Sequence, residues 1–114
     1  MTIVGCDFHP GWQQVAVFDS ETGEVREQKL ENGNGEAERF YRSLPSPARV
    51  GFEACGNTQW FEDLLDGLGH EVWIGDAEPW ADRVQWLVAY ILQRDRFRIA
   101  YGAMKRIAKV HSVE

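Results

Sequence analysis

The sequence predicts an α/β fold built on one mixed sheet. Short apolar segments bounded by Gly, Pro and Asn turns indicate strands, and two longer segments space their apolar residues as helices do. Their order along the chain is β-β-β-α-β-α-β. A helix between successive later strands implies parallel pairing through right-handed crossovers. The fourth strand is therefore expected beside the first.

The first three strands are expected to form an antiparallel meander. The first covers residues 3–8 and the second covers residues 13–18. A turn at Thr22-Gly23 leads to a third segment, residues 24–30, in which charges alternate with apolar residues. This charged alternation is typical of a strand at the edge of a sheet.

Two crossover units follow the meander. A helix is expected over residues 36–44 and a strand over 48–54. A second helix over 58–68, ended by Gly69, leads to a strand over 70–74. The apolar stripe predicted to bury this second helix consists of Trp60, Phe61, Leu64, Leu65 and Leu68.

We divide the chain into a core, residues 1–77, and a helical tail, residues 78–114. Pro79 suits the first turn of a tail helix that continues to about residue 94. Residues 100–110 form a second, basic amphipathic stretch. At 114 residues, 44% of them hydrophobic, the chain is long enough for one domain with a real core.

The charge of the chain is unevenly distributed. The formal net charge is −6; residues 1–75 hold 5 basic and 13 acidic residues, and residues 76–114 hold 7 basic and 5 acidic. Nucleic-acid affinity comes mainly from Lys and Arg neutralising phosphates. We therefore expect no tight grip on DNA by this chain alone, and tight binding with a steep salt dependence would contradict that expectation.

The apolar runs and the cysteines indicate the cellular compartment of the protein. The longest apolar run, residues 86–92, is too short to span a bilayer, and residues 1–4 lack the basic region of a signal peptide. We expect a cytoplasmic protein with no membrane partner. Cys6 and Cys55 fit a reducing compartment as buried, inert thiols rather than as zinc ligands.

Asp7 and Glu53 are the candidate site residues that the pattern singles out. Each lies near the carboxyl end of an otherwise apolar strand, where an unpaired charge is unfavourable. On adjacent strands they would repel by about 4 kcal/mol at ~4 Å with an effective dielectric near 20. A proton shared between the two carboxylates would relieve this repulsion, and so would a divalent cation with oxygen ligands. The alternative is that each carboxylate simply faces water at a strand end.

His9 follows Asp7 by two residues, so both can face the same side of the strand. It could assist at the metal, and a solvent-exposed histidine at a strand end is the competing interpretation. Among the five tryptophans, Trp60 and Trp73 are expected in the core, whereas Trp80 and Trp86 are candidates for an exposed association patch.

Three blocks of the core resemble those of DEDD-type insertion-sequence transposases, the insertion-sequence-110 family. The first is Val4-Gly5-Cys6-Asp7-Phe8-His9 with the segments 13–17 and 21–25. The second is Glu53-Ala54-Cys55-Gly56 with residues 58–61, and the third is the segment 68–77. The resemblance covers residues 1–77 continuously.

This resemblance implies a RuvC-like N-terminal domain with an RNase-H-like fold: three antiparallel strands, then parallel strands with crossover helices. It implies DNA transposition and recombination through four acidic residues that bind Mg²⁺, with DNA and a guide RNA as partners. Asp7 matches the first acid and Glu53 the second, so both are expected as catalytic metal ligands. A second domain carrying a nucleophilic serine completes such proteins.

The third and fourth acids are where the sequence departs from the family. The family supplies them as Asp-x-x-Asp, a spacing that is absent after Gly75. Asp82 is the nearest match and our third catalytic candidate, although Gln85 then stands in the place of the last acid. Asp95 is a looser alternative.

We therefore expect the N-terminal part of a transposase, truncated or degenerate, with an incomplete site and little or no nuclease activity by itself. One alternative is a non-catalytic dimerisation or regulatory module derived from a transposase, which would dimerise with a full-length relative through its apolar tail or form a homo-oligomer. A weaker alternative is half of an actin-like or sugar-kinase ATPase. The sequence disfavours it because Phe8-His9-Pro10 replaces a glycine-rich phosphate loop after Asp7.

Overall fold

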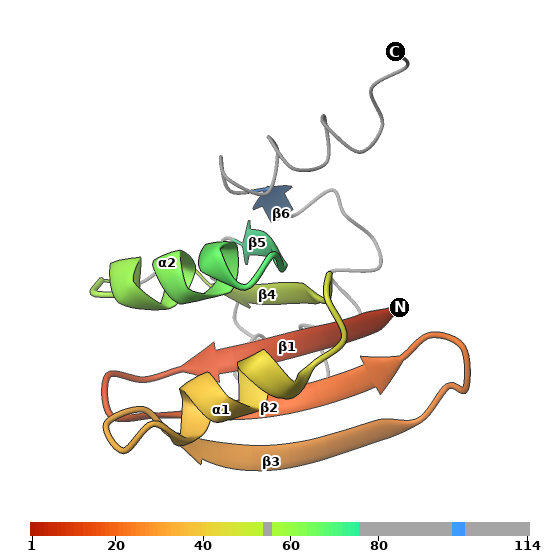
Figure 1. Ribbon diagram of the computed structural model, residues 1–114, viewed down its shortest axis with the longest axis horizontal. Coiled ribbons are helices and arrows are strands. Elements are labelled where there is room, and N and C mark those ends of the chain that lie inside the picture. Colours follow the sequence, from red (N-terminus) through yellow and green to blue (C-terminus); the bar gives the residue numbers. More distant parts are fainter. Residues whose placement is uncertain (54–55, 76–96, 100–114) are drawn as a thin grey trace.

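The computed structural model describes residues 1–53, 56–75 and 97–99. The predicted order β-β-β-α-β-α-β is confirmed, and one further strand follows it (Figure 1). The elements are β1 (Thr2–Phe8), β2 (Trp12–Asp19), β3 (Val25–Glu31), α1 (Glu36–Ser43), β4 (Arg49–Glu53), α2 (Gln59–Gly67), β5 (Glu71–Gly75) and β6 (Phe97–Ile99).

All six strands form one mixed sheet in the order β3-β2-β1-β4-β5-β6. β1 pairs antiparallel with β2, and β2 pairs antiparallel with β3, so the predicted meander is confirmed. β4 lies parallel to β1, and β5 lies parallel to β4. The expected neighbourhood of the first and fourth strands is therefore also confirmed. β1 stands at the point where the antiparallel half meets the parallel half.

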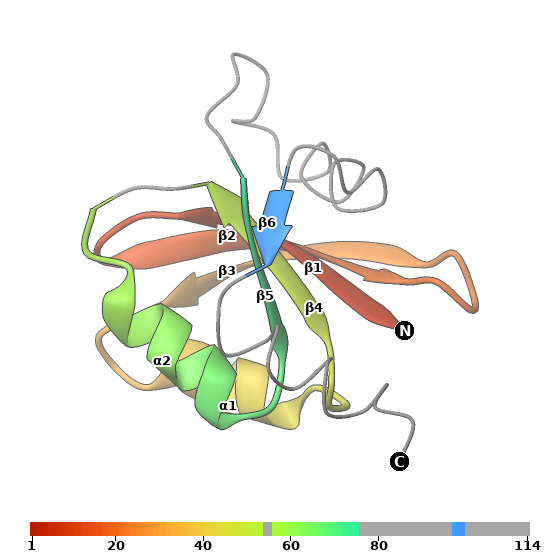
Figure 2. The same cartoon turned by 90° about the horizontal axis from the view of Figure 1, so that it is seen from above.

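Both helices cover the same face of the sheet (Figure 2). The strand residues that point toward them alternate with residues that point away, as the pleat requires. Together with the helices they form one buried cluster, whose strand members are Val4, Cys6, Val15, Val17, Leu30, Val50, Phe52 and Val72. From the helices, Tyr41, Phe61 and Leu65 are fully buried in it. Neither described helix, of eight and nine residues, is long and apolar enough to cross a membrane.

The end of α2 fixes the start of β5. Gly69 has a φ of +83°, the left-handed conformation that glycine adopts without strain. The Gly69 N–H donates to the Asp66 carbonyl (3.0 Å), and the His70 N–H donates to the Leu65 carbonyl (3.0 Å). This pair of bonds is a Schellman motif, so the predicted glycine cap is confirmed.

The side chain of His70 joins the two crossover units. Its ring is buried, with 1% of its surface exposed. The ring Nδ1 accepts from the Ala48 N–H (2.9 Å), and the ring Nε2 donates to the Tyr41 carbonyl (2.8 Å). His70 therefore links the last turn of α1 to the start of β4 and satisfies two backbone groups that the core hides from water.

Trp60 corrects one prediction about α2. It was expected in the core, but 43% of its surface is exposed. The fully buried residues of α2 are Phe61 and Leu65, so the stripe that faces the sheet is narrower than the sequence pattern indicated. Trp73, in contrast, is buried as expected, with 4% exposed.

Residues Phe97–Ile99 correct the expectation of a helical tail. They form the strand β6, which pairs antiparallel with β5. The physical reason is the open edge of β5, whose backbone N–H and C=O groups need partners. The apolar-polar-apolar order of Phe97, Arg98 and Ile99 suits a strand. The rest of the predicted tail, including Pro79, lies outside the described residues.

We predict that His70→Ala lowers the free energy of unfolding by about 2–4 kcal/mol. The change leaves the buried Ala48 N–H without a partner, which costs about 1–3 kcal/mol. It also leaves the Tyr41 carbonyl with only the longer bond from the Leu44 N–H (3.4 Å) and empties the buried space of the ring. Urea unfolding followed by circular dichroism measures the effect. Gln59→Ala, on the exposed side of α2, is the control and should stay within about 0.5 kcal/mol of the parent. An equally small effect of His70→Ala would contradict the bridging role.

Candidate functional site

Asp7 and Glu53 occupy neighbouring positions on β1 and β4. The register pairs Ile3 with Arg49 and continues without interruption to Cys6 with Phe52. Carried one residue further, the same register sets Asp7 opposite Glu53, on strands about 4.8 Å apart. The two carboxylates thus stand at the carboxyl ends of the two central strands.

Both carboxylates belong to the face of the sheet that the helices do not cover. Cys6 and Phe52, the preceding residues on each strand, are completely buried in the cluster under the helices. Because side chains alternate across a strand, Asp7 and Glu53 point the opposite way. The Asp7 side chain is 32% exposed, so water and a small cation can reach it.

The flanking strands frame this pair. Asp7 pairs with Gln14 of β2, and Glu53 pairs with Gly75 of β5. A glycine beside Glu53 leaves no side chain on that flank. The described strand neighbours of the pair are thus the Gln14 amide on β2 and Gly75 on β5.

His9 is the described residue that contacts the Asp7 carboxylate. Its Nε2 lies 3.2 Å from Asp7 Oδ2. An ionised carboxylate only accepts hydrogen bonds, so Nε2 carries the proton of this contact. The expectation that His9 faces the same side as Asp7 is confirmed. His9 is also 40% exposed at its side chain, so the contact lies at the edge of solvent.

Asp82, the third predicted acid, lies outside the described residues, as do Gln85 and Asp95. Within residues 1–53, 56–75 and 97–99, no three or more His, Cys, Asp or Glu side chains form a group that could hold a metal ion. Of the predicted acids, the described part of the chain therefore brings together two.

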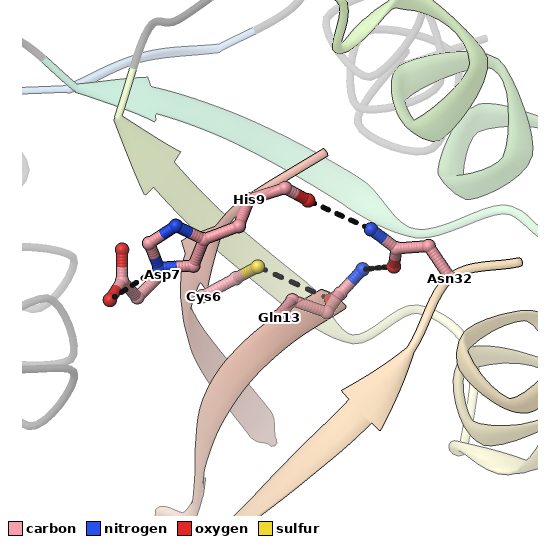
Figure 3. A network of polar contacts seen from close by, with 5 residues as sticks. All are labelled: Cys6, Asp7, His9, Gln13 and Asn32. Atoms are coloured by element: carbon pink, nitrogen blue, oxygen red, sulfur yellow. Dashed lines mark hydrogen bonds and ion pairs between the residues drawn. The ribbon is translucent and has the colours of Figure 1, made fainter. Parts of the chain in front are cut away.

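Gln13 organises a buried polar network beside the site, and sequence reasoning missed it. Its Oε1 accepts from the Tyr41 hydroxyl (2.6 Å) and from the Cys6 thiol (3.2 Å). Its Nε2 donates to Asn32 Oδ1 (2.9 Å), and Figure 3 shows Asn32 reaching the backbone of His9. The signal was present in the sequence, because Gln13 shares its strand parity with the buried Val15.

Cys6 is a free, buried thiol, as expected. It points toward the helices, whereas His9 belongs with Asp7 on the other side of β1, so the two do not approach a shared metal from one face. Cys55 lies outside the described residues.

Burial raises the pKa of the Tyr41 phenol well above its ordinary value of 10.0, and the adjacent Cys6 thiol raises it further. The neutral phenol is the form that donates to Gln13 Oε1. The phenolate would place a negative charge in the core against an oxygen acceptor, which low dielectric makes costly.

An open hollow of about 590 Å³ lies at the same end of the sheet. Its lining residues are Pro10, Gly11, Glu31, Asn32, Gly33, Asn34 and Trp60. The Trp60 ring forms an aromatic wall and is braced from behind by Phe8 (ring centroids 5.9 Å apart) and Phe61 (5.7 Å). Glu31 makes the hollow unfavourable for a bare phosphate.

The donor set determines what the site can do chemically. Two carboxylates at adjacent strand ends supply hard oxygen ligands. Mg²⁺ is usually held by one or two carboxylates, with water and substrate phosphate oxygens completing its shell. Asp7 and Glu53 could supply two such carboxylates, and the described residues add no third His, Cys, Asp or Glu ligand to them.

No protein-family model matches the chain, and no curated protein matches it significantly.

We predict that stability falls above about pH 10 and that Tyr41 causes part of the fall. A group whose pKa is raised on folding contributes stability that is complete below its unfolded pKa and is lost as pH rises through its folded pKa. Urea unfolding at a series of alkaline pH values measures the slope. Tyr41→Phe should cost about 1 kcal/mol at neutral pH, through its lost hydrogen bond, yet flatten the alkaline slope. An unchanged slope would show that Tyr41 does not contribute.

Proposed function

We propose that this chain is the N-terminal, RNase-H-like part of a DNA transposase that acts in DNA recombination through a Mg²⁺-dependent acidic site. The observation that carries the proposal is the parallel register of β1 and β4, which runs from Ile3–Arg49 to Cys6–Phe52. Asp7 and Glu53 are the next residues on the two strands. The ordered resemblance of residues 1–77 to the insertion-sequence-110 transposases supports it independently.

The topology supports the RNase-H-like part of the proposal. An antiparallel meander followed by two parallel strands, each reached through a helix, is the arrangement that the resemblance implies. The acids of such a site come from the central strands of the sheet. Asp7 and Glu53 occupy that position on β1 and β4.

Asp7 and Glu53 would hold the cation through their carboxylate oxygens. When bound, Mg²⁺ polarises the scissile phosphate and stabilises the charge on the attacking and leaving oxygens. The carboxylates would keep the ion at the carboxyl end of the sheet, on the face opposite α1 and α2, where the Asp7 side chain is 32% exposed.

We propose further that the site is incomplete in this chain. Two acids hold an ion weakly unless substrate oxygens complete its shell. The net charge of −6 also opposes a phosphate backbone. Guide RNA, DNA and a complementary domain would have to come together on this chain before it could cut DNA.

A non-catalytic interaction module is the second candidate, and the exposed Trp60 favours it. An aromatic side chain with 43% of its surface exposed, beside an open hollow, is a common anchor for a partner. This function requires no cation at Asp7, so the two candidates separate experimentally.

For the metal site, we predict that calorimetric titration with Mg²⁺ or Mn²⁺ detects one weak site. Loss of a residue that only hydrogen-bonds a metal ligand weakens metal binding by roughly 10- to 100-fold. Asp7→Asn and Glu53→Gln each remove a proposed ligand, so each should weaken Mg²⁺ binding by at least this factor. Asp63→Asn, an exposed acid on α2, removes the same charge elsewhere and should leave binding unchanged. Equal binding by all four proteins would refute the metal site.

For the interaction module, we predict reversible self-association in sedimentation velocity as concentration rises. Trp60→Ser should abolish it, because the aromatic wall of the hollow is lost, while leaving the fold intact by circular dichroism. Glu27→Ser, an exposed change on β3, is the control. A parent chain that stays monomeric at all concentrations would rule out a homo-oligomer through this face.

A further inference from the structure

The contact between His9 and Asp7 engages Oδ2 of the carboxylate and, among the described residues, not Oδ1. The His9 Nε2 lies 3.2 Å from Oδ2. The terminal torsion of an aspartate is broad, so a carboxylate without such a partner swings freely. A donor fixed in space therefore selects one orientation of Asp7.

The ring of His9 is itself held in place. It stacks on the ring of Trp12, with ring centroids 4.2 Å apart and planes 14° from parallel. The ammonium of Lys29 lies 4.9 Å from the centroid of that same tryptophan. The stack holds the imidazole plane, and with it the direction of the Nε2–H bond.

The backbone of His9 is fixed from two sides. Its N–H donates to the Trp12 carbonyl (2.9 Å), which closes the turn between β1 and β2. Its carbonyl accepts from Asn32 Nδ2 (2.9 Å). Figure 3 shows His9 between Asp7, on its ring side, and Asn32, on its carbonyl side.

Asn32 connects this turn to the core. Its Oδ1 accepts from Gln13 Nε2 (2.9 Å), and Gln13 is completely buried. The backbone of His9 is therefore tied, through Asn32 and Gln13, to the packing beneath the helices.

We infer that His9 is a positioning residue: it orients the Asp7 carboxylate so that Oδ1 is available to the cation. This inference rests on the proposed metal site. Mg²⁺ prefers oxygen ligands over imidazole, so His9 acts through Asp7. Holding the carboxylate ready before binding lowers the ordering penalty when the ion arrives. Such outer partners change metal affinity by about 10- to 100-fold.

The test is Mg²⁺ calorimetry on variants of this 114-residue chain that separate stacking from hydrogen bonding. His9→Phe keeps an aromatic ring for Trp12 but donates nothing to Asp7, and it should bind Mg²⁺ about 10- to 100-fold more weakly. His9→Gln offers an amide N–H and should recover most of the affinity. His111→Phe makes the same chemical change at another histidine and serves as the control. Thermal unfolding of each variant verifies that the fold persists.

The outcomes distinguish this inference from the function on which it rests. Parental affinity in His9→Phe, with binding lost in Asp7→Asn, overturns the positioning role and leaves the metal site standing. Parental binding in Asp7→Asn overturns the metal site itself. A loss in His9→Phe that His9→Gln does not recover also overturns the positioning role.

A measurement on the parent chain covers the case in which His9→Phe does not fold. Nitrogen-15 spectra of the imidazoles should show His9 protonated at Nε2. Its resonances should shift as Mg²⁺ is added, because the ion redistributes charge on Asp7. The midpoint of this shift should fall at the same Mg²⁺ concentration as the midpoint measured by calorimetry. Resonances of His9 that stay still while Mg²⁺ binds would overturn the inference.

Discussion

The parallel pairing of β1 with β4 is the constraint on which the rest of the structure depends. β1 pairs with β2 along its whole length on one edge and with β4 from Ile3 to Cys6 on the other. A parallel neighbour requires a crossover, and α1 supplies it on the face that becomes the core. β4 can then accept β5 by a second crossover on the same side. The pairing of β1 with β4 thus places the apolar core on one face of the sheet and brings Asp7 and Glu53 to neighbouring strand ends on the other.

The buried network around Gln13 adds specificity to that scaffold. Hydrophobic burial alone would accept several neighbouring arrangements of α1 over β1 and β2. A buried amide without partners is destabilising by about 1–3 kcal/mol, so the arrangement that satisfies Gln13 is selected over its neighbours. Tyr41 and Asn32 provide those partners from α1 and from the loop before it. Gln13 thereby connects the position of α1, through Tyr41, to the turn that carries His9, through Asn32.

Sequence reasoning located the elements because their signals are local. Alternation in β1 and β2, the turn at Gly23 and the cap at Gly69 each depend on a few adjacent residues. The neighbourhood of Asp7 and Glu53 also followed, since crossover rules restrict the topology. The prediction that Trp60 is buried was wrong because Trp60 lies at the margin of the apolar stripe of α2. There, a small rotation of the helix about its axis decides whether a side chain is buried or exposed. The strand Phe97–Ile99 depends on the distant edge of β5, which no local window contains.

Side chains alternate between the two faces of the sheet along β1 and β4. This alternation determines which insertions in the chain leave Asp7 and Glu53 together on one face. Insertions at the Thr22–Gly23 turn lengthen a hairpin and leave the register of the central strands intact. A single residue inserted between Arg49 and Phe52 would rotate Glu53 to the helix side, beneath α2, and separate it from Asp7. A pair of inserted residues would restore its face but shift it along the strand. In descendants of this chain, length variation should therefore accumulate at the turns, while the spacing within these two strands stays fixed.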